Sequence, residues 1–224
     1  MFDLIGGKAK IEEIKATEEP VEVIKDKKVF RVTTEKGDFA VIVKQIYKSF
    51  EETPKLELEQ RKLSITIFET KLPNLAIANE IDLLSEDADI FETARVSPWI
   101  NETTPFSDLS LINILTDPLK LTAIVEVANF CINQLENNGR RFDFLKGPEF
   151  KSLPESVRAI LRVIKNINLF EGIDQNGNKI IFADSDWFSI IEAESPMAKH
   201  ALKTWERTAI IAGFLITIAN KLKR

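Results

Sequence analysis

The sequence predicts an α+β fold in two lobes, which together make one two-lobed domain. Residues 1–100 would form an N-terminal antiparallel sheet with one packed helix, and residues 101–224 a mostly helical C-terminal lobe. Two observations lead to this expectation. β-branched and aromatic runs separated by turn signals fill the first part of the chain, whereas apolar residues at helical spacing fill most of the rest. The pattern changes near residues 98–107, where we expect the lobe boundary.

The N-terminal elements follow from local patterns. Strands are expected at residues 29–34 and 39–46, because "VFRVTT" alternates, "FAVIVKQI" is rich in β-branched and aromatic residues, and "EKGD" between them is a turn signal. "VEVI" adds a further strand before them. A helix is expected at residues 52–71, with proline in its first turn. "LPNLAIANEIDLLS" and "DADIFETARVSPWI" predict two more strands joined by "SEDAD", and "SPWINETTPFSD" predicts a loop.

The C-terminal elements are mainly helices. "DPLKLTAIVEVANFCINQLENNG" has a helical period and ends in Asn-Gly, a favourable C-cap. "LPESVRAILRVIKNI" predicts a second helix, and residues 197–222 predict a third. Between them, "INLF", the turn "DQNGN" and "KIIFA" predict a short two-stranded unit. The apolar run at residues 209–219 is about half the ~20 residues that span a bilayer, so we expect a buried helix there.

Composition excludes several classes of protein. A net charge of −5 argues against a nucleic-acid binder that works by neutralising phosphates. The single cysteine, Cys131, excludes an intrachain disulfide and a cysteine-cluster metal site, and its apolar helical surroundings predict a packing role. The single histidine excludes a multi-histidine metal site. The N-terminus is too charged for a signal peptide, so the sequence predicts a cytoplasmic protein without membrane association.

The stretch "NGNKIIFADSDW" at residues 176–187 is the best candidate for chemistry. A turn leads into an apolar strand, which ends in Asp184, and Asp186 follows one residue later. Carboxylate oxygens are the ligands that Mg²⁺ prefers, and an aspartate at a strand's end is held rigidly. The two aspartates are therefore candidate metal ligands.

The order of elements resembles the protein-kinase-like fold, particularly its small bacterial kinase-like and aminoglycoside-phosphotransferase-like members. "FAVIVK" looks like the strand whose lysine, here Lys44, holds the nucleotide phosphates. Glu59 shares the apolar face of the next helix with Leu56 and Leu63, and looks like the ion-pair partner of Lys44. "ARVSPWI" resembles the strand and hinge that hold the adenine. The resemblance implies ATP and magnesium as cofactors.

The remaining catalytic positions depart from the family in spacing. In "GRRFDFL", Asp143 sits where a catalytic aspartate would follow, and in "NINLF", Asn168 resembles the magnesium-binding asparagine that works with Asp184. Asp143 and Asn168 are 25 residues apart, where the family keeps them about five apart. Either a helix is inserted between them or Asp143 is not the base. "IKDKKVF" also lacks the glycine-rich loop, so the resemblance fits a phosphotransferase with weak or no activity.

Other interpretations remain open. If the chain binds no nucleotide, Lys44 is expected to be a solvated surface residue, Asp143 to pair with the neighbouring arginines, and Asn168 to cap a turn. Asp-x-Asp after an apolar strand also fits a metal-dependent glycosyltransferase that uses a nucleotide sugar. A non-enzymatic interaction or regulatory protein without nucleotide is the main alternative, with Trp99, Trp187 and Phe188 as a surface for a protein partner.

Overall fold

The computed structural model describes residues 20–24, 27–35, 37–47, 63, 67, 79–87, 90–142, 144, 157–183, 188–192 and 194–222. The chain divides into two compact units. The first consists of Met1–Ile67, Ile77–Asn101 and Ile173–Lys179, and the second of Phe68–Ala76, Glu102–Gly172 and Ile180–Arg224. Antiparallel strands and helices both occur, so the predicted α+β class is confirmed. The helix predicted at residues 52–71 lies largely outside the described residues; Leu63 and Ile67 are helical.

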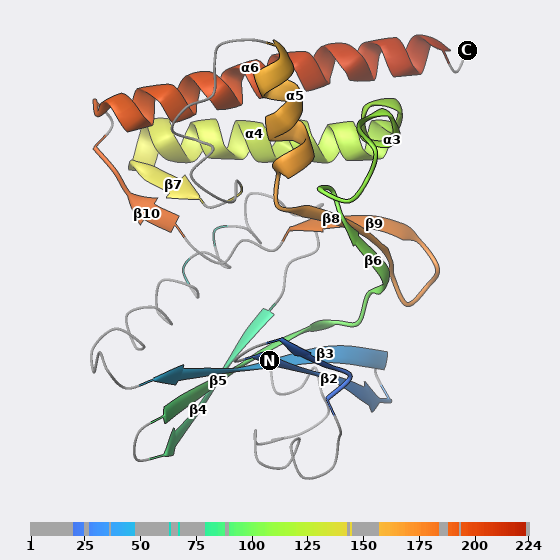
Figure 1. Ribbon diagram of the computed structural model, residues 1–224, viewed down its shortest axis with the longest axis vertical. Coiled ribbons are helices and arrows are strands. Elements are labelled where there is room, and N and C mark those ends of the chain that lie inside the picture. Colours follow the sequence, from blue (N-terminus) through green and yellow to red (C-terminus); the bar gives the residue numbers. More distant parts are fainter. Residues whose placement is uncertain are drawn as a thin grey trace. The chain divides into compact units, whose positions relative to one another are not determined.

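The first unit is built on a five-stranded sheet in the order β1-β2-β3-β5-β4 (Figure 1). Every pairing in it is antiparallel. The predicted strands before and after the "EKGD" turn form the hairpin of β2 and β3, and the predicted strands around "SEDAD" form β4 and β5. The strands are β1 (Glu22–Ile24), β2 (Lys27–Thr34), β3 (Gly37–Tyr47), β4 (Asn79–Asp87) and β5 (Ile90–Pro98).

One face of this sheet supplies its core. Phe39, Val41 and Val43 alternate along β3 and are all buried, as the two-residue period of a strand requires. Val41 pairs with Phe30 of β2 on one side and with Val96 of β5 on the other. Both partners are buried as well, so the centre of the core is a cross-strand row of apolar side chains.

The turn between β8 and β9 belongs to the first unit, where Gln175 contacts the start of β3. Its side-chain amide accepts a hydrogen bond from the Asp38 backbone N–H at 3.3 Å and donates to the Asp38 carbonyl. Gly37 makes room for this contact, because a Cβ on it would lie 2.1 Å from Gln175 Oε1. Its φ of 118° also lies in the region that favours glycine.

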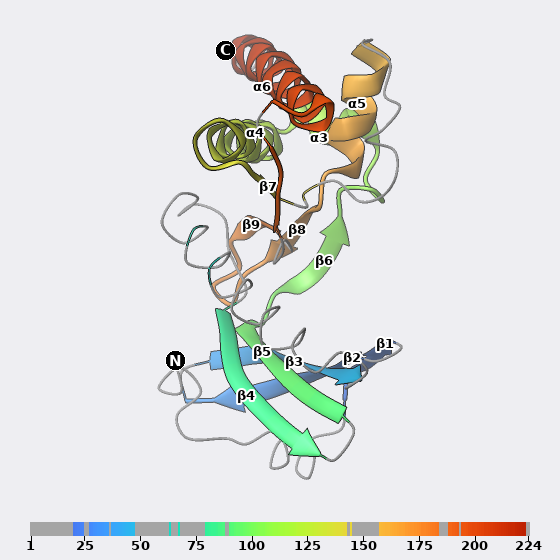
Figure 2. The ribbon, with the colours of Figure 1, turned by 90° about the vertical axis from the view of Figure 1, so that its left-hand side faces the viewer.

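The second unit contains helices α3 (Leu111–Thr116), α4 (Pro118–Asn138), α5 (Val157–Asn166) and α6 (Pro196–Leu222). The helices predicted from periodicity are confirmed, and Gly139 ends α4 in the left-handed conformation. α4 and α6 lie side by side in both ribbon views (Figures 1 and 2). They run antiparallel, because Ile191, shortly before α6, donates to the Gly139 carbonyl at 2.9 Å. Cys131 of α4 is buried, as predicted, and so is Trp205 of α6.

Two small sheets complete the second unit. One has the order β6-β8-β9, with β6 (Asn101–Pro105), β8 (Leu169–Ile173) and β9 (Lys179–Ala183); the other pairs β7 (Arg140–Phe142) with β10 (Phe188–Ile190). The two-stranded unit of β8 and β9 is as predicted, but the loop predicted at residues 97–108 is wrong, because it contains β6. β6 is an edge strand that pairs with β8 alone, and the side chains of Asn101, Glu102 and Thr103 are exposed. Its sequence therefore lacks the alternation of apolar residues from which a strand is predicted.

The apolar run at residues 209–219 forms the C-terminal half of α6, and only one of its sides is buried. Ala212 and Ala219 are buried, whereas Ile210 and Phe214 are 70% and 65% exposed. The expectation of a buried helix is wrong for the outer side, because a helix packed along one side turns part of a continuous apolar run outward. Among the described helices, none combines the length and the hydropathy needed to cross a membrane.

We expect Gly37→Ala to lower the free energy of unfolding by about 1–3 kcal/mol, because alanine must adopt an unfavourable φ and displace the Gln175 amide from Asp38. Gly177→Ala is the matched control, since Gly177 also has a positive φ (81°) but open space around it. Denaturant unfolding should show the larger loss for Gly37→Ala, and the excess should vanish when Gln175 is also alanine. Equal losses for the two glycines would contradict the contact.

Candidate functional site

Asn168 lies between α5 and β8 and is buried, with 8% of its surface exposed. Its backbone N–H donates to the Phe144 carbonyl at 2.7 Å. Phe144 directly follows Asp143 in the sequence, so two segments that are far apart along the chain meet here. α5 occupies part of the interval between them. A helix thus lies between the positions of Asp143 and Asn168 in the sequence, and the role of Asp143 as the base stays a prediction.

The hairpin of β8 and β9 adds a third segment. The two strands are neighbours, and the turn between them is closed by a hydrogen bond from Asp174 N–H to the Asn178 carbonyl at 2.9 Å. The start of β8, next to Asn168, and the end of β9, at Ala183, therefore lie at the same open end of the hairpin. Asp184 is the next residue after Ala183 in the sequence.

The ladder of β7 and β10 adds a fourth segment. Phe142 pairs with Phe188 and Arg140 with Ile190 in an antiparallel register. The end of β7 and the start of β10 therefore lie side by side. In the sequence, Asp143 comes directly after β7, and Asp186 comes two residues before β10. The last residue of β7, Phe142, and the first of β10, Phe188, thus lie at the same end of the ladder.

Several of the predicted site residues lie outside the described residues: Asp143, Asp184, Asp186 and Glu59. Trp187, the predicted partner-surface residue, lies outside them as well. Within the part of the chain that the structure describes, no three acidic, histidine or cysteine side chains gather where they could hold a metal ion. Of the predicted metal ligands, Asn168 is among the described residues, and so is Ala183, which precedes Asp184 in the sequence.

Lys44 belongs to the first unit, and its backbone lies in an interior strand. Its Cα pairs with that of Lys27 in β2 and with that of Thr93 in β5. It is therefore not on an edge strand, although its side chain is outside the described part of the structure. Leu63, which shares a helix face with Glu59 in the sequence, is 43% exposed, so that face reaches solvent at this point.

Sequence reasoning missed a buried cation, Lys120 of α4. Its side chain is 1% exposed, and its Nζ lies 2.8 Å from Glu171 Oε2 and 3.7 Å from Asp117 Oδ2. It also donates a hydrogen bond to Asn113 Oδ1. The signal was present in the sequence, because Lys120 falls four residues before Ile124 and so lies on the apolar stripe of α4.

The Lys120 ion pair holds β8 in place. Glu171 lies in β8, three residues after Asn168, while Lys120 and Asp117 belong to the start of α4. A buried charge must be paired, and here two carboxylates and an amide oxygen surround the Lys120 ammonium group. The cluster therefore joins α4 to β8 through an ion pair. Its effect on the site is to fix the strand that begins beside Asn168.

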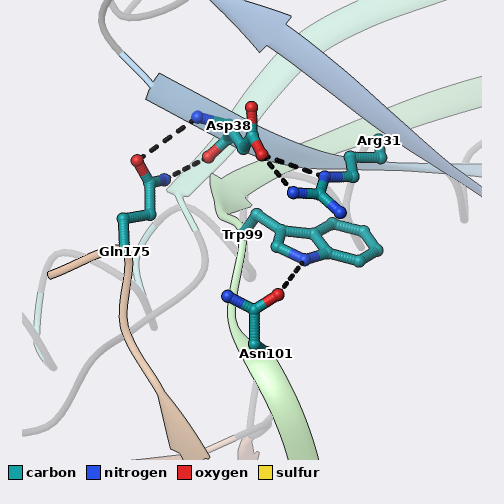
Figure 3. Close-up of polar contacts among 5 residues, drawn as sticks. All are labelled: Arg31, Asp38, Trp99, Asn101 and Gln175. Carbon is teal, nitrogen blue, oxygen red and sulfur yellow. Dashed lines mark hydrogen bonds and ion pairs between the residues drawn. The ribbon is translucent and has the colours of Figure 1, made fainter. Parts of the chain in front are cut away.

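In the first unit, the segment predicted to hold adenine is fixed around Trp99 (Figure 3). The Trp99 indole N–H donates to Asn101 Oδ1 at 3.0 Å, and its backbone N–H donates to the Asp38 carbonyl at 2.9 Å. The Arg31 guanidinium lies over the indole, 5.0 Å from its centre, and pairs with the Asp38 carboxylate. Trp99 is half-buried in this contact, so only part of its ring is available to a partner.

We expect Lys120→Met to lower the free energy of unfolding by about 3 kcal/mol, because it leaves the Glu171 carboxylate largely buried without its cation. Adding Glu171→Leu should restore most of the loss. Lys199→Met is the matched control, since Lys199 pairs with Glu194 at 2.7 Å on the surface and should contribute less than about 1 kcal/mol. Denaturant unfolding measures all four proteins. A loss no larger than that of the control would show that the buried pair does not hold β8.

The Arg31 guanidinium, followed by a hydrogen bond from Thr33, lowers the pKa of Asp38 below its usual 3.8. The stabilisation is therefore present above pH 3.8 and is lost as the pH falls through the lowered folded-state pKa. We expect Asp38→Asn to destabilise the protein at neutral pH and to have less effect as the pH falls below 3.8. Unfolding measured across this range tests it. With Arg31→Gln in the background, the pH dependence of the Asp38→Asn effect should largely disappear; its persistence would rule out Arg31 as the main cause.

The second unit thus joins, through backbone contacts, the chain positions next to Asp143, Asn168 and Asp184. The first unit supplies an interior strand with Lys44 and a fixed segment at Trp99. Oxygen ligands such as those expected in the second unit suit metal binding, and a lysine such as the one in the first unit suits charge stabilisation. Comparisons of the chain with protein-family models, with curated proteins and with solved structures found no match.

Proposed function

We propose that the chain is a divergent kinase-like protein that binds ATP with magnesium and has weak or no phosphoryl-transfer activity. The observation that carries this proposal is the hydrogen bond from Asn168 N–H to the Phe144 carbonyl. Protein kinases keep a catalytic aspartate and a magnesium-binding asparagine about five residues apart in one loop. Here Asn168 makes a backbone contact with Phe144, the residue after Asp143 in the sequence, although α5 lies between them along the chain.

The proposed metal site combines Asn168 with Asp184 and Asp186. An amide oxygen and carboxylates are suitable ligands for Mg²⁺, which keeps several waters and binds the phosphates of a nucleotide. The hairpin geometry supports this assignment, because the start of β8, which Asn168 precedes, and Ala183, which precedes Asp184 in the sequence, lie at the same open end. The metal would neutralise charge on the phosphates, which is the main requirement of phosphoryl transfer.

The remaining roles are assigned by resemblance and chemistry. Lys44 would contact the nucleotide phosphates, Glu59 would orient Lys44, and Asp143 would accept the proton of an acceptor hydroxyl. The interior position of the Lys44 backbone in the sheet supports a fixed lysine rather than one on an edge strand. We propose the cytoplasm as the place of this activity.

A nucleotide-free interaction protein is the second candidate. The exposed apolar side chains of Ile210 and Phe214 on α6 favour it, since they are available to a protein partner. It differs from the first candidate in predicting no effect of nucleotide or magnesium on the folded protein.

We expect ATP with magnesium at millimolar concentration to raise the thermal unfolding midpoint. A ligand that binds only the folded state stabilises it by about 2.7 kcal/mol at a hundredfold excess over its dissociation constant. The rise should require magnesium and should be lost in Asp184→Ala and Lys44→Ala. Asp143→Asn should keep it, because a catalytic base contacts the acceptor and not the metal or the phosphates.

Asp108→Ala and Lys203→Ala are the matched controls, since both residues are exposed and neither has a role in the proposed site. Both should keep the full rise. A rise that survives Asp184→Ala and Lys44→Ala unaltered would show that the site is assigned to the wrong residues. The absence of any rise with ATP or GTP in the parent protein would favour the nucleotide-free interaction protein.

A further inference from the structure

The outer side of α6 carries a row of exposed apolar side chains. Ile210, Phe214 and Ile218 are 70%, 65% and 38% exposed, and they follow one another at intervals of four residues, so they lie on one face of the helix. The opposite side of the same segment buries Ala212 and Ala219. Three large apolar side chains in a row on one helix face are typical of a contact with another helix.

The centre of this row contains a recess. Gly213 lies beside Phe214, and a Cβ built on Gly213 would meet no atom within 4 Å. Glycine in the interior of a helix is unfavourable, so it usually has a packing reason. One turn later, the Thr217 hydroxyl donates to the Gly213 carbonyl at 3.1 Å, which satisfies that hydroxyl within the helix. The face is thus apolar with an open space at its middle.

Charges lie symmetrically about this centre and have opposite signs. Glu206 lies seven residues before Gly213, and Lys221 lies seven residues after Phe214; both are exposed. When two such helices pair antiparallel around residues 213 and 214, Glu206 of each copy faces Lys221 of the other copy. When they pair in parallel, Glu206 faces Glu206 and Lys221 faces Lys221. The face is therefore complementary to itself in the antiparallel arrangement only.

We propose that this face of α6 binds a second copy of the chain, as an antiparallel two-fold pair of α6 helices centred on Gly213 and Phe214. Phe214 of each copy enters the recess at Gly213 of the other, and Ile210 of each packs against Thr217 of the other. Such an isologous interface buries the three exposed apolar side chains of both copies at once. It uses none of the residues assigned to nucleotide binding, so it stands independently of that function.

The mass of the full chain in solution tests this proposal, measured by sedimentation equilibrium from micromolar to near-millimolar concentration. The parent protein should form a dimer, and Phe214→Glu should be monomeric at every concentration. Phe214 is exposed, so its replacement should leave the circular dichroism spectrum unchanged. Ile112→Glu is the matched control, because Ile112 is 76% exposed on a different helix, α3, and should leave the dimer intact. A monomeric parent protein, or a dimer that survives Phe214→Glu, would overturn the proposal.

The charges and the direction of pairing are tested separately. Glu206→Lys and Lys221→Glu should each weaken the dimer by about tenfold, and the two together should restore it. Oxidation should cross-link an Ile210→Cys protein to a Thr217→Cys protein when the two are mixed, and neither protein to itself, because residue 210 faces residue 217 of the other copy. The native Cys131 is buried and does not compete. Cross-linking of each variant with itself, and none between the two, would overturn the antiparallel arrangement. Flotation of a monomeric parent protein with phosphatidylcholine vesicles, lost in Phe214→Glu, would assign the face to a lipid surface instead.

Discussion

The backbone hydrogen bond between Asn168 and Phe144 is the constraint on which the proposed chemistry of the second unit depends. It joins the two ends of the chain segment that contains α5. The β8–β9 hairpin then adds the end of β9, and the β7–β10 ladder adds the start of β10. These contacts use peptide groups and not side chains, so they do not depend on which residue occupies each position. The contacts among these segments can therefore persist when the residues at these positions change.

The buried ion pair between Lys120 and Glu171 secures the same region from the helical side. Ion pairs of this kind add little net stability, since removing two charges from water offsets most of their attraction. Here the pair joins Glu171 of β8 to Lys120 of α4. The pair and the backbone bond at Asn168 thus hold β8 at two positions, one through charge and one through peptide groups.

Local patterns predicted most of the elements, and long-range placement was beyond them. The end of α4 at Gly139 follows from turn chemistry, and the helices follow from their periodicity. Edge strand β6 was missed because its polar, exposed residues show no alternation. The exposed side of α6 was missed because hydrophobicity does not tell which side of a helix is covered. Lys120 was missed because a lysine is usually expected to be exposed to solvent. The approach of Asn168 to Phe144 depends on tertiary contacts that no local period encodes. The roles of Asp143 and Asp184 stay predictions.

The first unit consists of three separate stretches of chain, so it cannot be completed in the order of synthesis. Its last stretch, Ile173–Lys179, carries Gln175, whose amide completes the hydrogen bonds of the Asp38 backbone at the start of β3. On the ribosome, domains generally fold from the N-terminus as the chain emerges. Here the sheet of the first unit can pair early, but its contact at Asp38 waits until most of the second unit has been synthesised. A fragment cut at residue 101 would carry the five strands and still lack one of their supports.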